Sequence, residues 1–178
     1  MILTGPKIEA EIANDRIQIS PFNKELVNPN SYNYRLGDEL LVMPGIIDTR
    51  SQSATERIVI PEEGYTLQPG IVYLGFTYEK IGSTTYVPSL IGRSSLGRLG
   101  LFLQITADLG HVGTYHNWAL EMTVVQPLRI YPLMRIGQVS FWKTDGLELI
   151  EGNDYSQKRD TYAQYSTSTP SQVHKFFE

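Results

Sequence analysis

The segment GRSSLGRLGL, beginning at Gly92, gathers the residue types that bind phosphate. Arg93, Ser94, Ser95 and Arg98 bring two guanidinium groups and two hydroxyls together, among glycines that loosen the backbone, just before an apolar run. Charge-assisted and bidentate hydrogen bonds suit such a set to phosphate oxygens. Arginine is also a common surface residue, so a solvated loop with capping serines remains the alternative.

One carboxylate lies inside the apolar segment NWALEMTVV. On a strand, Ala119, Glu121 and Thr123 face one side, while Leu120 and Met122 face the other. Both sides are largely apolar, so we expect Glu121 in a partly buried place. A carboxyl group balanced between burial and a nearby arginine can carry protons near neutral pH. A structural carboxylate paired with arginine, or an edge charge facing water, remains the alternative.

Other common catalytic patterns are absent from the sequence. It has no cysteine, and its histidines are His111, His116 and His174, so we expect no zinc site. The first two histidines are not at helical spacing, and Gly113 between them indicates a loop. No GxxxxGK[ST], GxGxxG or GxSxG segment occurs, which argues against the usual nucleotide cradles and the nucleophile elbow.

The elements that must position these residues are mostly strands. Short apolar runs alternate with glycine and proline, which predicts a β-barrel or a jelly-roll-like sandwich. One short helix is expected over residues 6–13, where Pro6 precedes Ile8 and Ile12 at i, i+4 spacing. The expected strands are 34–36, 40–42, 57–60, 71–77, 101–106, 118–125, 128–131 and 137–142.

Composition limits the protein class. With 178 residues, 41% of them hydrophobic, a single domain is the default. The net charge of −4 argues against a nucleic-acid partner, although a few local arginines can still hold a small anion. The chain shows neither a basic segment followed by an apolar one at its start nor a long apolar run, so we expect a cytoplasmic protein without a membrane partner.

From Asn153 onward the chain is polar and rich in serine and threonine. Such a tail is often disordered. Its tyrosines, at positions 155, 162 and 165, suggest instead a flap that becomes ordered over a ligand. Both interpretations remain open from composition alone.

The order of these segments resembles the dCTP deaminase branch of the dUTPase superfamily. The likeness is carried by GRSSLGRLGL, then Thr106-Ala107, then Leu120-Glu121, then MRIGQVSF from Met134, and it extends over nearly the whole chain. NPNSYNYRLGDEL resembles the family's early strand, YTLQPGIVYLGFTYEKI its middle hairpin and TYAQYSTSTPSQV its C-terminal arm.

This resemblance implies an all-β fold, a distorted dUTPase-like barrel or jelly roll with a short N-terminal helix and a C-terminal arm. Residues 1–152 would form the nucleotide-binding domain, and residues 153–178 the arm that closes the active site. The family forms homotrimers with each site between subunits. It converts dCTP to dUTP and ammonia without zinc, uses Mg²⁺ on the triphosphate, and has dTTP as a candidate inhibitor.

The resemblance also implies residue roles. Glu121 would move protons, while Ser94 and Arg98 would orient the water and the base. The remaining predicted nucleotide contacts are Arg93, Ser95, Ala107, His111, Ala119, Leu120, Tyr155, Tyr162 and Tyr165.

Several positions depart from the family pattern. His111 replaces an aspartate that contacts the deoxyribose, and an imidazole can also bind a hydroxyl. His116 stands where the family has glycine. In the arm, Thr161 and Tyr165 replace a lysine and a glutamine, and Lys158 or Arg159 could supply the missing charge.

Three functions therefore remain open. The first is deamination of dCTP. The second is action on another deoxycytidine nucleotide, or hydrolysis of a deoxynucleoside triphosphate to its monophosphate. The third is nucleotide binding without turnover.

Overall fold

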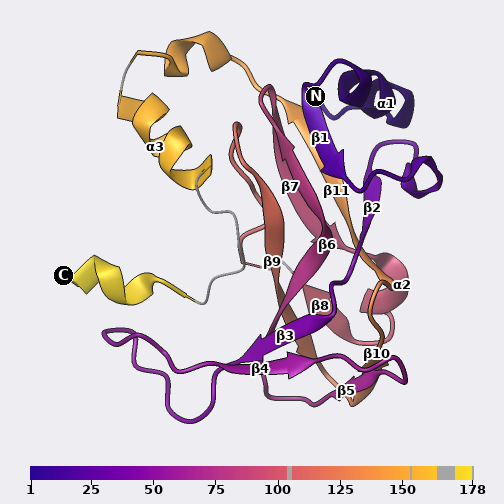
Figure 1. Cartoon of the computed structure of the whole chain (residues 1–178), viewed down its shortest axis with the longest axis vertical. Coiled ribbons are helices and arrows are strands. Elements are labelled where there is room, and N and C mark those ends of the chain that lie inside the picture. Colours follow the sequence, from indigo (N-terminus) through magenta and orange to yellow (C-terminus); the bar gives the residue numbers. More distant parts are fainter. Residues whose placement is uncertain (104–105, 153, 164–170, 178) are drawn as a thin grey trace.

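Strands make up most of the structure, which is a computed structural model describing residues 1–103, 106–152, 154–163 and 171–177 (Figure 1). The strands of this part of the chain are β1 (Ile17–Ser20), β2 (Tyr32–Arg35), β3 (Glu39–Val42), β4 (Glu56–Val59), β5 (Tyr65–Leu67), β6 (Tyr73–Ser83), β7 (Tyr86–Gly92), β8 (Leu101–Leu103), β9 (Tyr115–Val124), β10 (Leu128–Ile130) and β11 (Arg135–Lys143). The predicted all-β class is confirmed.

The strands are arranged in three sheets. The largest has the order β4-β3-β6-β9-β8, and β1 also pairs with β6. A second sheet has the order β2-β11-β7, and β10 pairs with β5 in the third. All of these pairings are antiparallel, and the described strands do not close into one barrel.

One hydrophobic core receives side chains from the two larger sheets. Both β6 and β9 turn one face inward, while β2 and β11 supply aromatic and aliphatic residues from the second sheet. The core residues with no exposed surface include Tyr32, Tyr34, Leu120, Met122, Ile81, Val139 and Phe141. Burying this apolar surface is the main favourable contribution to folding.

Three strands lie outside the expected set: β1, β5 and β7. In β7, Pro88 cannot donate to a ladder, which weakens the sequence signal for a strand. The second sheet tolerates it because β7 is an edge strand. The expected strand over 71–77 is also longer than predicted, since β6 continues to Ser83 through an irregularity after Phe76.

The helices are short. The helix α1 (Gly5–Ala13) confirms the prediction over 6–13, with Ile8 fully buried and Pro6 in its first turn. The helix α2 (Ser94–Gly97) occupies the arginine–serine segment. In the tail, α3 (Asp154–Ala163) is a helix where one interpretation expected irregular chain, and η1 (Lys24–Leu26), η2 (Leu147–Ile150) and η3 (Val173–Phe177) are 3₁₀ turns.

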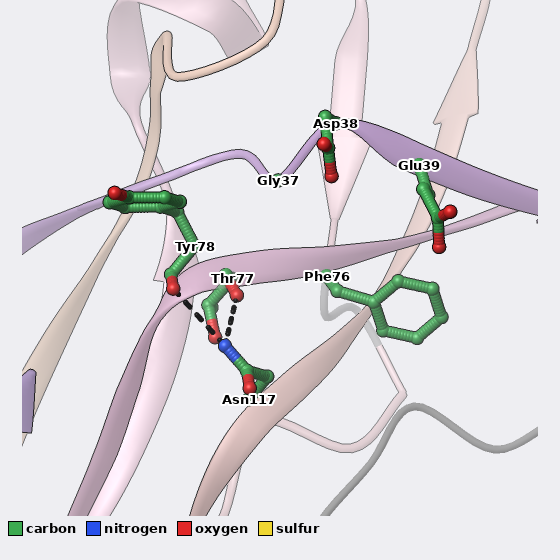
Figure 2. Close-up of a pocket in the computed structure, with 7 residues that line it drawn as sticks. All are labelled: Gly37, Asp38, Glu39, Phe76, Thr77, Tyr78 and Asn117. Atoms are coloured by element: carbon green, nitrogen blue, oxygen red, sulfur yellow. Dashed lines mark hydrogen bonds between the residues drawn. The ribbon is translucent and has the colours of Figure 1, made fainter. Parts of the chain in front are cut away.

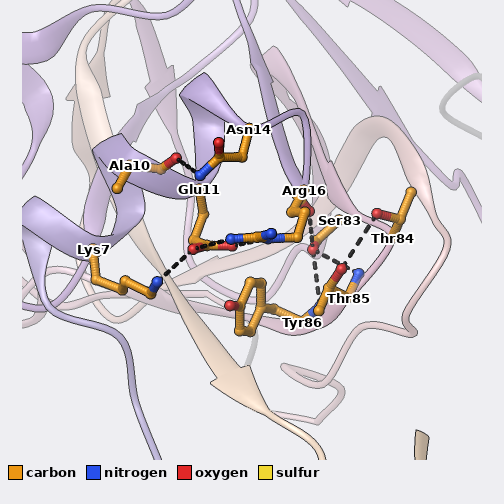
Figure 3. Close-up of polar contacts among 9 residues, drawn as sticks. All are labelled: Lys7, Ala10, Glu11, Asn14, Arg16, Ser83, Thr84, Thr85 and Tyr86. Carbon is orange, nitrogen blue, oxygen red and sulfur yellow. Dashed lines mark hydrogen bonds and ion pairs between the residues drawn. The ribbon is translucent and has the colours of Figure 1, made fainter. Parts of the chain in front are cut away.

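A buried carboxylate fastens α1 to the sheets (Figure 3). Glu11 has no exposed surface and accepts from Arg16 through Nη2 at 2.7 Å and through Nε, while Lys7 Nζ lies 2.6 Å from Oε1. The hydrogen bonds from Arg16, and then from Lys7, lower the pKa of Glu11 to about 2. The carbonyl of Arg16 accepts from the hydroxyl of Ser83 at the end of β6, which links the helix to the largest sheet.

We predict that Glu11→Gln lowers the melting temperature near pH 7 by about 2–8 °C, because charged hydrogen bonds are lost. A carboxyl whose pKa is lowered on folding stabilises the fold above its unfolded value of about 4.5, and this stabilisation disappears as the pH falls towards 2. The difference between wild type and variant should therefore shrink over that window in thermal or urea unfolding.

Glu9→Gln is the matched control on the same helix. Glu9 pairs with Lys24 at 2.9 Å, but the Lys24 side chain is exposed and that of Glu9 is only partly buried, so the pair contributes little. Equal losses in the two variants, or a Glu11 effect that persists at pH 2, would contradict the prediction.

Candidate active site

The arginine–serine segment forms a tight turn between β7 and β8. Arg93 precedes α2, and its backbone carbonyl accepts from the amides of Leu96 and Gly97. Its guanidinium donates to Asn33 Oδ1 at 2.6 Å, and Asn33 is a buried residue of β2. The segment is therefore anchored at Arg93, not a freely solvated loop.

The other three candidate side chains of this segment face outward. Ser94 and Ser95 form the first turn of α2 and are exposed, as is Arg98 directly after the helix. Neither serine is the N-cap, since Arg93 holds that position without a capping side-chain bond. Two hydroxyls and one guanidinium are thus accessible to an anion approaching α2.

Glu121 lies on β9, the strand between β6 and β8. Leu120, Met122 and Val124 are buried, whereas Ala119 and Glu121 are partly buried, so the expected alternation and the partly buried carboxylate are both confirmed. Leu120 has no exposed surface in the single chain. The ligand roles of Ala119 and Leu120 stay predictions.

The loop that follows β8 carries Ala107 and His111, both exposed. This loop is held against β7, because the amide of Leu90 donates to the carbonyl of Asp108 and the amide of Gly110 to that of Pro88, each at 2.8 Å. The Oγ of Ser89 adds a bond of 3.1 Å to the Asp108 carboxylate. The two predicted ligand contacts therefore stand on an attached loop, at the edge of the second sheet.

Two tilted aromatic rings of β9 lie next to this loop. The rings of His116 and Trp118 have their centroids 4.3 Å apart, and the indole nitrogen of Trp118 donates to the carbonyl of Ile81 at 2.9 Å. Burial lowers the pKa of His116 below its ordinary value, which favours a neutral ring near pH 7. The expected loop between His111 and His116 is confirmed, and Gly113 within it has φ of +89°.

The arginine–serine turn and Glu121 lie on different elements. The turn joins β7 to β8, whereas Glu121 is on β9. The carbonyl of Gly100, at the end of the turn, accepts from the amide of Val125 at 3.1 Å. Glu121 lies four residues before Val125, roughly 13 Å along an extended strand. The bond between Gly100 and Val125 joins the end of the turn to the residue that follows β9, the strand that carries Glu121.

The arm supplies fewer described side chains. Tyr155 is 65% exposed, and Lys158 Nζ lies 5.5 Å from the centre of its ring. Tyr162 is in α3, but its side chain lies outside the described residues, as does the whole of Tyr165. Their nucleotide contacts stay predictions.

The described residues lack both a metal-binding cluster and a membrane-spanning helix. No group of three or more histidine, aspartate or glutamate residues in this part of the chain could hold a metal ion. Within the same residues, no helix is long and apolar enough to cross a membrane.

The structure also reveals polar residues that sequence patterns did not single out. Thr77 and Glu79 of β6 are buried, and the Glu79 carboxylate accepts from Arg35 Nε at 2.7 Å. Asn117 lies two residues from Ala119 on the same face of β9. A cavity of about 250 Å³ lies beside Thr77 and Asn117 (Figure 2), and its lining residues are Gly37, Asp38, Glu39, Phe76, Thr77, Tyr78 and Asn117. In the sequence, Thr77 and Glu79 are recognisable only as polar residues that interrupt or follow the apolar run beginning at Ile71.

The antiparallel sheets around one hydrophobic core belong to the dUTPase-like fold class, as a solved structure indicates. The crystal structure of 2′-deoxycytidine 5′-triphosphate deaminase from Agrobacterium tumefaciens has a similar fold, with a TM-score of 0.64 and 18% sequence identity. The likeness covers 91% of this chain and 53% of that one.

The sequence relationship is closer and narrows the class. The family model described as dCTP deaminase-like matches residues 2–144, and the chain belongs to this family. A dCTP deaminase of Rhodopirellula baltica is 43% identical over 98% of this chain and 85% of its own length. A Clostridium botulinum (strain Alaska E43) protein named "dCTP deaminase, dUMP-forming" is 44% identical over 100% of this chain and 99% of its own.

Gly110 allows the close approach of the loop to its support. A Cβ at this position would lie 2.5 Å from the Trp118 ring and 3.0 Å from the carbonyl oxygen of Pro88. We predict that Gly110→Ala costs about 1–3 kcal/mol of stability, because the backbone or the ring must shift. Calorimetry and amide exchange measure this, and the Leu90 amide, which is bonded to this loop, should exchange faster than in wild type.

Gly97→Ala serves as the matched stability control. No heavy atom lies within 4 Å of a Cβ there, and alanine favours helix, so its melting temperature should stay equal or rise slightly. A Gly110→Ala protein with wild-type stability and wild-type Leu90 exchange would show that the loop accepts the extra methyl group.

Proposed function

We propose that this protein deaminates dCTP to dUTP and ammonia. Water adds to C4 of the cytosine, a new C–O bond forms, and the C4–N bond to the amino group breaks. The main support is the family membership, together with the presence of Arg93, Ser94, Arg98 and Glu121 in one chain.

In this proposal Glu121 moves the protons. Its carboxylate takes a proton from the attacking water and delivers protons to the pyrimidine and the departing amine. Its partly buried position next to Leu74, its neighbour across the β6–β9 pairing, supports this role, because partial burial limits competing water. Ser94 and Arg98 orient the water and the base.

The remaining contacts hold the nucleotide. Arg93 and Ser95 bind the triphosphate, and the backbone at Ala107 and Ala119 lies against the pyrimidine, next to Leu120. His111 donates to or accepts from the deoxyribose hydroxyl. The arm, residues 153–178, closes over the bound nucleotide with Tyr155, Tyr162 and Tyr165, and residues 1–152 form the domain that it covers.

We further propose a homotrimer whose sites lie between subunits. The exposure of Ser94, Ser95 and Arg98 in the single chain supports this, because a neighbouring copy could complete a site around them. Apolar side chains exposed near the turn also support it, namely Ile91, Leu99 and Phe102, each between 42% and 48% exposed.

Mg²⁺ enters this proposal with the nucleotide. The described residues contain no cluster of three metal-ligating side chains, so the ion would be held by phosphate oxygens and water next to Arg93 and Ser95. When bound, it supplies charge neutralisation on the triphosphate. We place the protein in the cytoplasm, with dTTP as a candidate inhibitor at the same site.

The second candidate is further hydrolysis of dUTP to dUMP and pyrophosphate. The names of relatives favour it, since those from Clostridium botulinum and Hathewaya histolytica are called dUMP-forming. In this step water attacks the α-phosphorus, and the bond to the bridging oxygen breaks. The resemblance implies that the related diphosphatases activate water with an aspartate at this position. This chain has His111 there, so a different group would have to activate the water.

The decisive experiment incubates the full-length protein with Mg²⁺ and each of the common dNTPs and NTPs. We expect one ammonia per dCTP consumed, and dUTP as the uracil product. Appearance of dUMP with pyrophosphate would establish the second candidate. Tight dCTP binding without any product would overturn both.

Glu121→Gln tests the proton carrier. The amide keeps the size of the side chain but cannot accept the proton, so kcat should fall at least about 10²-fold while dCTP binding is largely retained. Single-turnover kinetics and calorimetric titration separate the two quantities. Unchanged turnover would refute the assigned role.

A further inference from the structure

The strand β6 contains an irregularity directly beside the stretch of β9 that carries Glu121. Phe76 pairs with Ala119 and Lys80 with Asn117, so three residues of β6 stand opposite Trp118 alone. A bulge of this kind bends a strand and changes the direction of nearby side chains. It therefore affects how the next residues of the pair are presented.

Side-chain bonds from both strands hold the bulge. Thr77 Oγ1 accepts from the amide of Trp118 at 2.8 Å and donates to the carbonyl of Glu79 at 2.7 Å. Asn117 Nδ2 donates to the carbonyls of Thr77 at 2.8 Å and Tyr78 at 3.1 Å, as Figure 2 shows. We call Thr77 and Asn117 the bulge clamp.

The bulge is also attached on its other side. Glu79 has no exposed surface, and its carboxylate accepts from Arg35 Nε at 2.7 Å and from the Arg35 amide at 2.8 Å. The amide of Gly37 donates to the carbonyl of Phe76 at 2.7 Å. A movement of the bulge would therefore break hydrogen bonds to Arg35 of β2, to Gly37 or to β9.

The register beyond the bulge places Glu121 opposite Leu74, in the third pair past the bulge, and on the same face of β9 as Asn117. In a sheet, a change of pairing by one residue reverses which face a side chain occupies. The clamp is roughly 13 Å from Glu121 along β9, so it acts through the strand rather than by contact.

We propose that Thr77 and Asn117 are positioning residues of the deaminase site, which hold the bulge of β6 and thereby set the register and direction in which β9 presents Glu121. This inference rests on the proposed role of Glu121. It assigns a function in the reaction to two residues that do not touch the reacting atoms.

The test compares Thr77→Val, which keeps the shape but loses the hydroxyl, with Thr77→Ser, which keeps the hydroxyl. Thr77→Val should lower kcat for dCTP at least about 10-fold with KM within about 3-fold, because a small misplacement of a reacting group is costly. Thr77→Ser should restore kcat to near wild type. Thr84→Val, at an exposed turn position, controls for the substitution itself.

Coupling to Glu121 separates positioning from general destabilisation. In the Glu121→Gln background, Thr77→Val should cause little further loss of kcat, since both changes disable the same group. An additive loss would overturn the proposal, as would a normal kcat in folded Thr77→Val. If that variant does not fold, Asn117→Ala carries the same expectation and the same refutation.

Amide exchange makes the inference independent of the activity. The Trp118 amide should exchange faster with solvent in Thr77→Val and at the wild-type rate in Thr77→Ser, independently of any enzymatic activity. Unchanged Trp118 protection in Thr77→Val overturns the clamp, whereas full activity of Glu121→Gln in the parent protein overturns the proposed function.

Discussion

The antiparallel pairing of β6 with β9 is the interaction on which the rest of the structure depends. It lies at the centre of the largest sheet, with β3 and β1 bonded to β6 and β8 bonded to β9. Its inner face carries Tyr73, Leu120 and Met122 into the core. The same backbone bonds therefore support the core and the strand that carries the candidate carboxylate.

The two faces of β9 lie in different environments, one in the hydrophobic core and one partly open to solvent. Leu120 and Met122 must leave water for the sheet to pack, and the two-residue period of a strand then directs Glu121 to the opposite face. The carboxylate avoids the cost of full burial on that side and remains accessible. Packing of apolar neighbours thus determines the place of a polar side chain.

The groups suited to an anion are attached to the two edge strands of the second sheet, β2 and β7. The turn around α2 begins at Arg93, whose guanidinium is bonded to Asn33 of β2, and the loop after β8 is bonded to β7. These attachments reduce the freedom of both segments before any ligand arrives, which lowers the entropic cost of binding.

Much of the fold follows from local sequence. The i, i+4 spacing of Ile8 and Ile12 predicts α1, and the alternation around Glu121 predicts β9 with its partly buried carboxylate, because both signals depend only on near neighbours. The segment that contains Pro88 gave no such signal, since a proline is acceptable in a strand only at the edge of a sheet, and edge position is a property of the assembled sheet.

The candidate site divides in the same way. The residue types at Arg93, Ser94, Ser95, Arg98 and Glu121 were determined by the sequence, and with the family resemblance they sufficed to indicate the chemistry. Only the tertiary structure decided that Arg93 bonds to Asn33, that Asn117 and Thr77 hold a bulge, and that Glu11 is buried under Arg16. The longest of these contacts joins residues 60 positions apart, and such pairings depend on how sheets pack rather than on any local pattern.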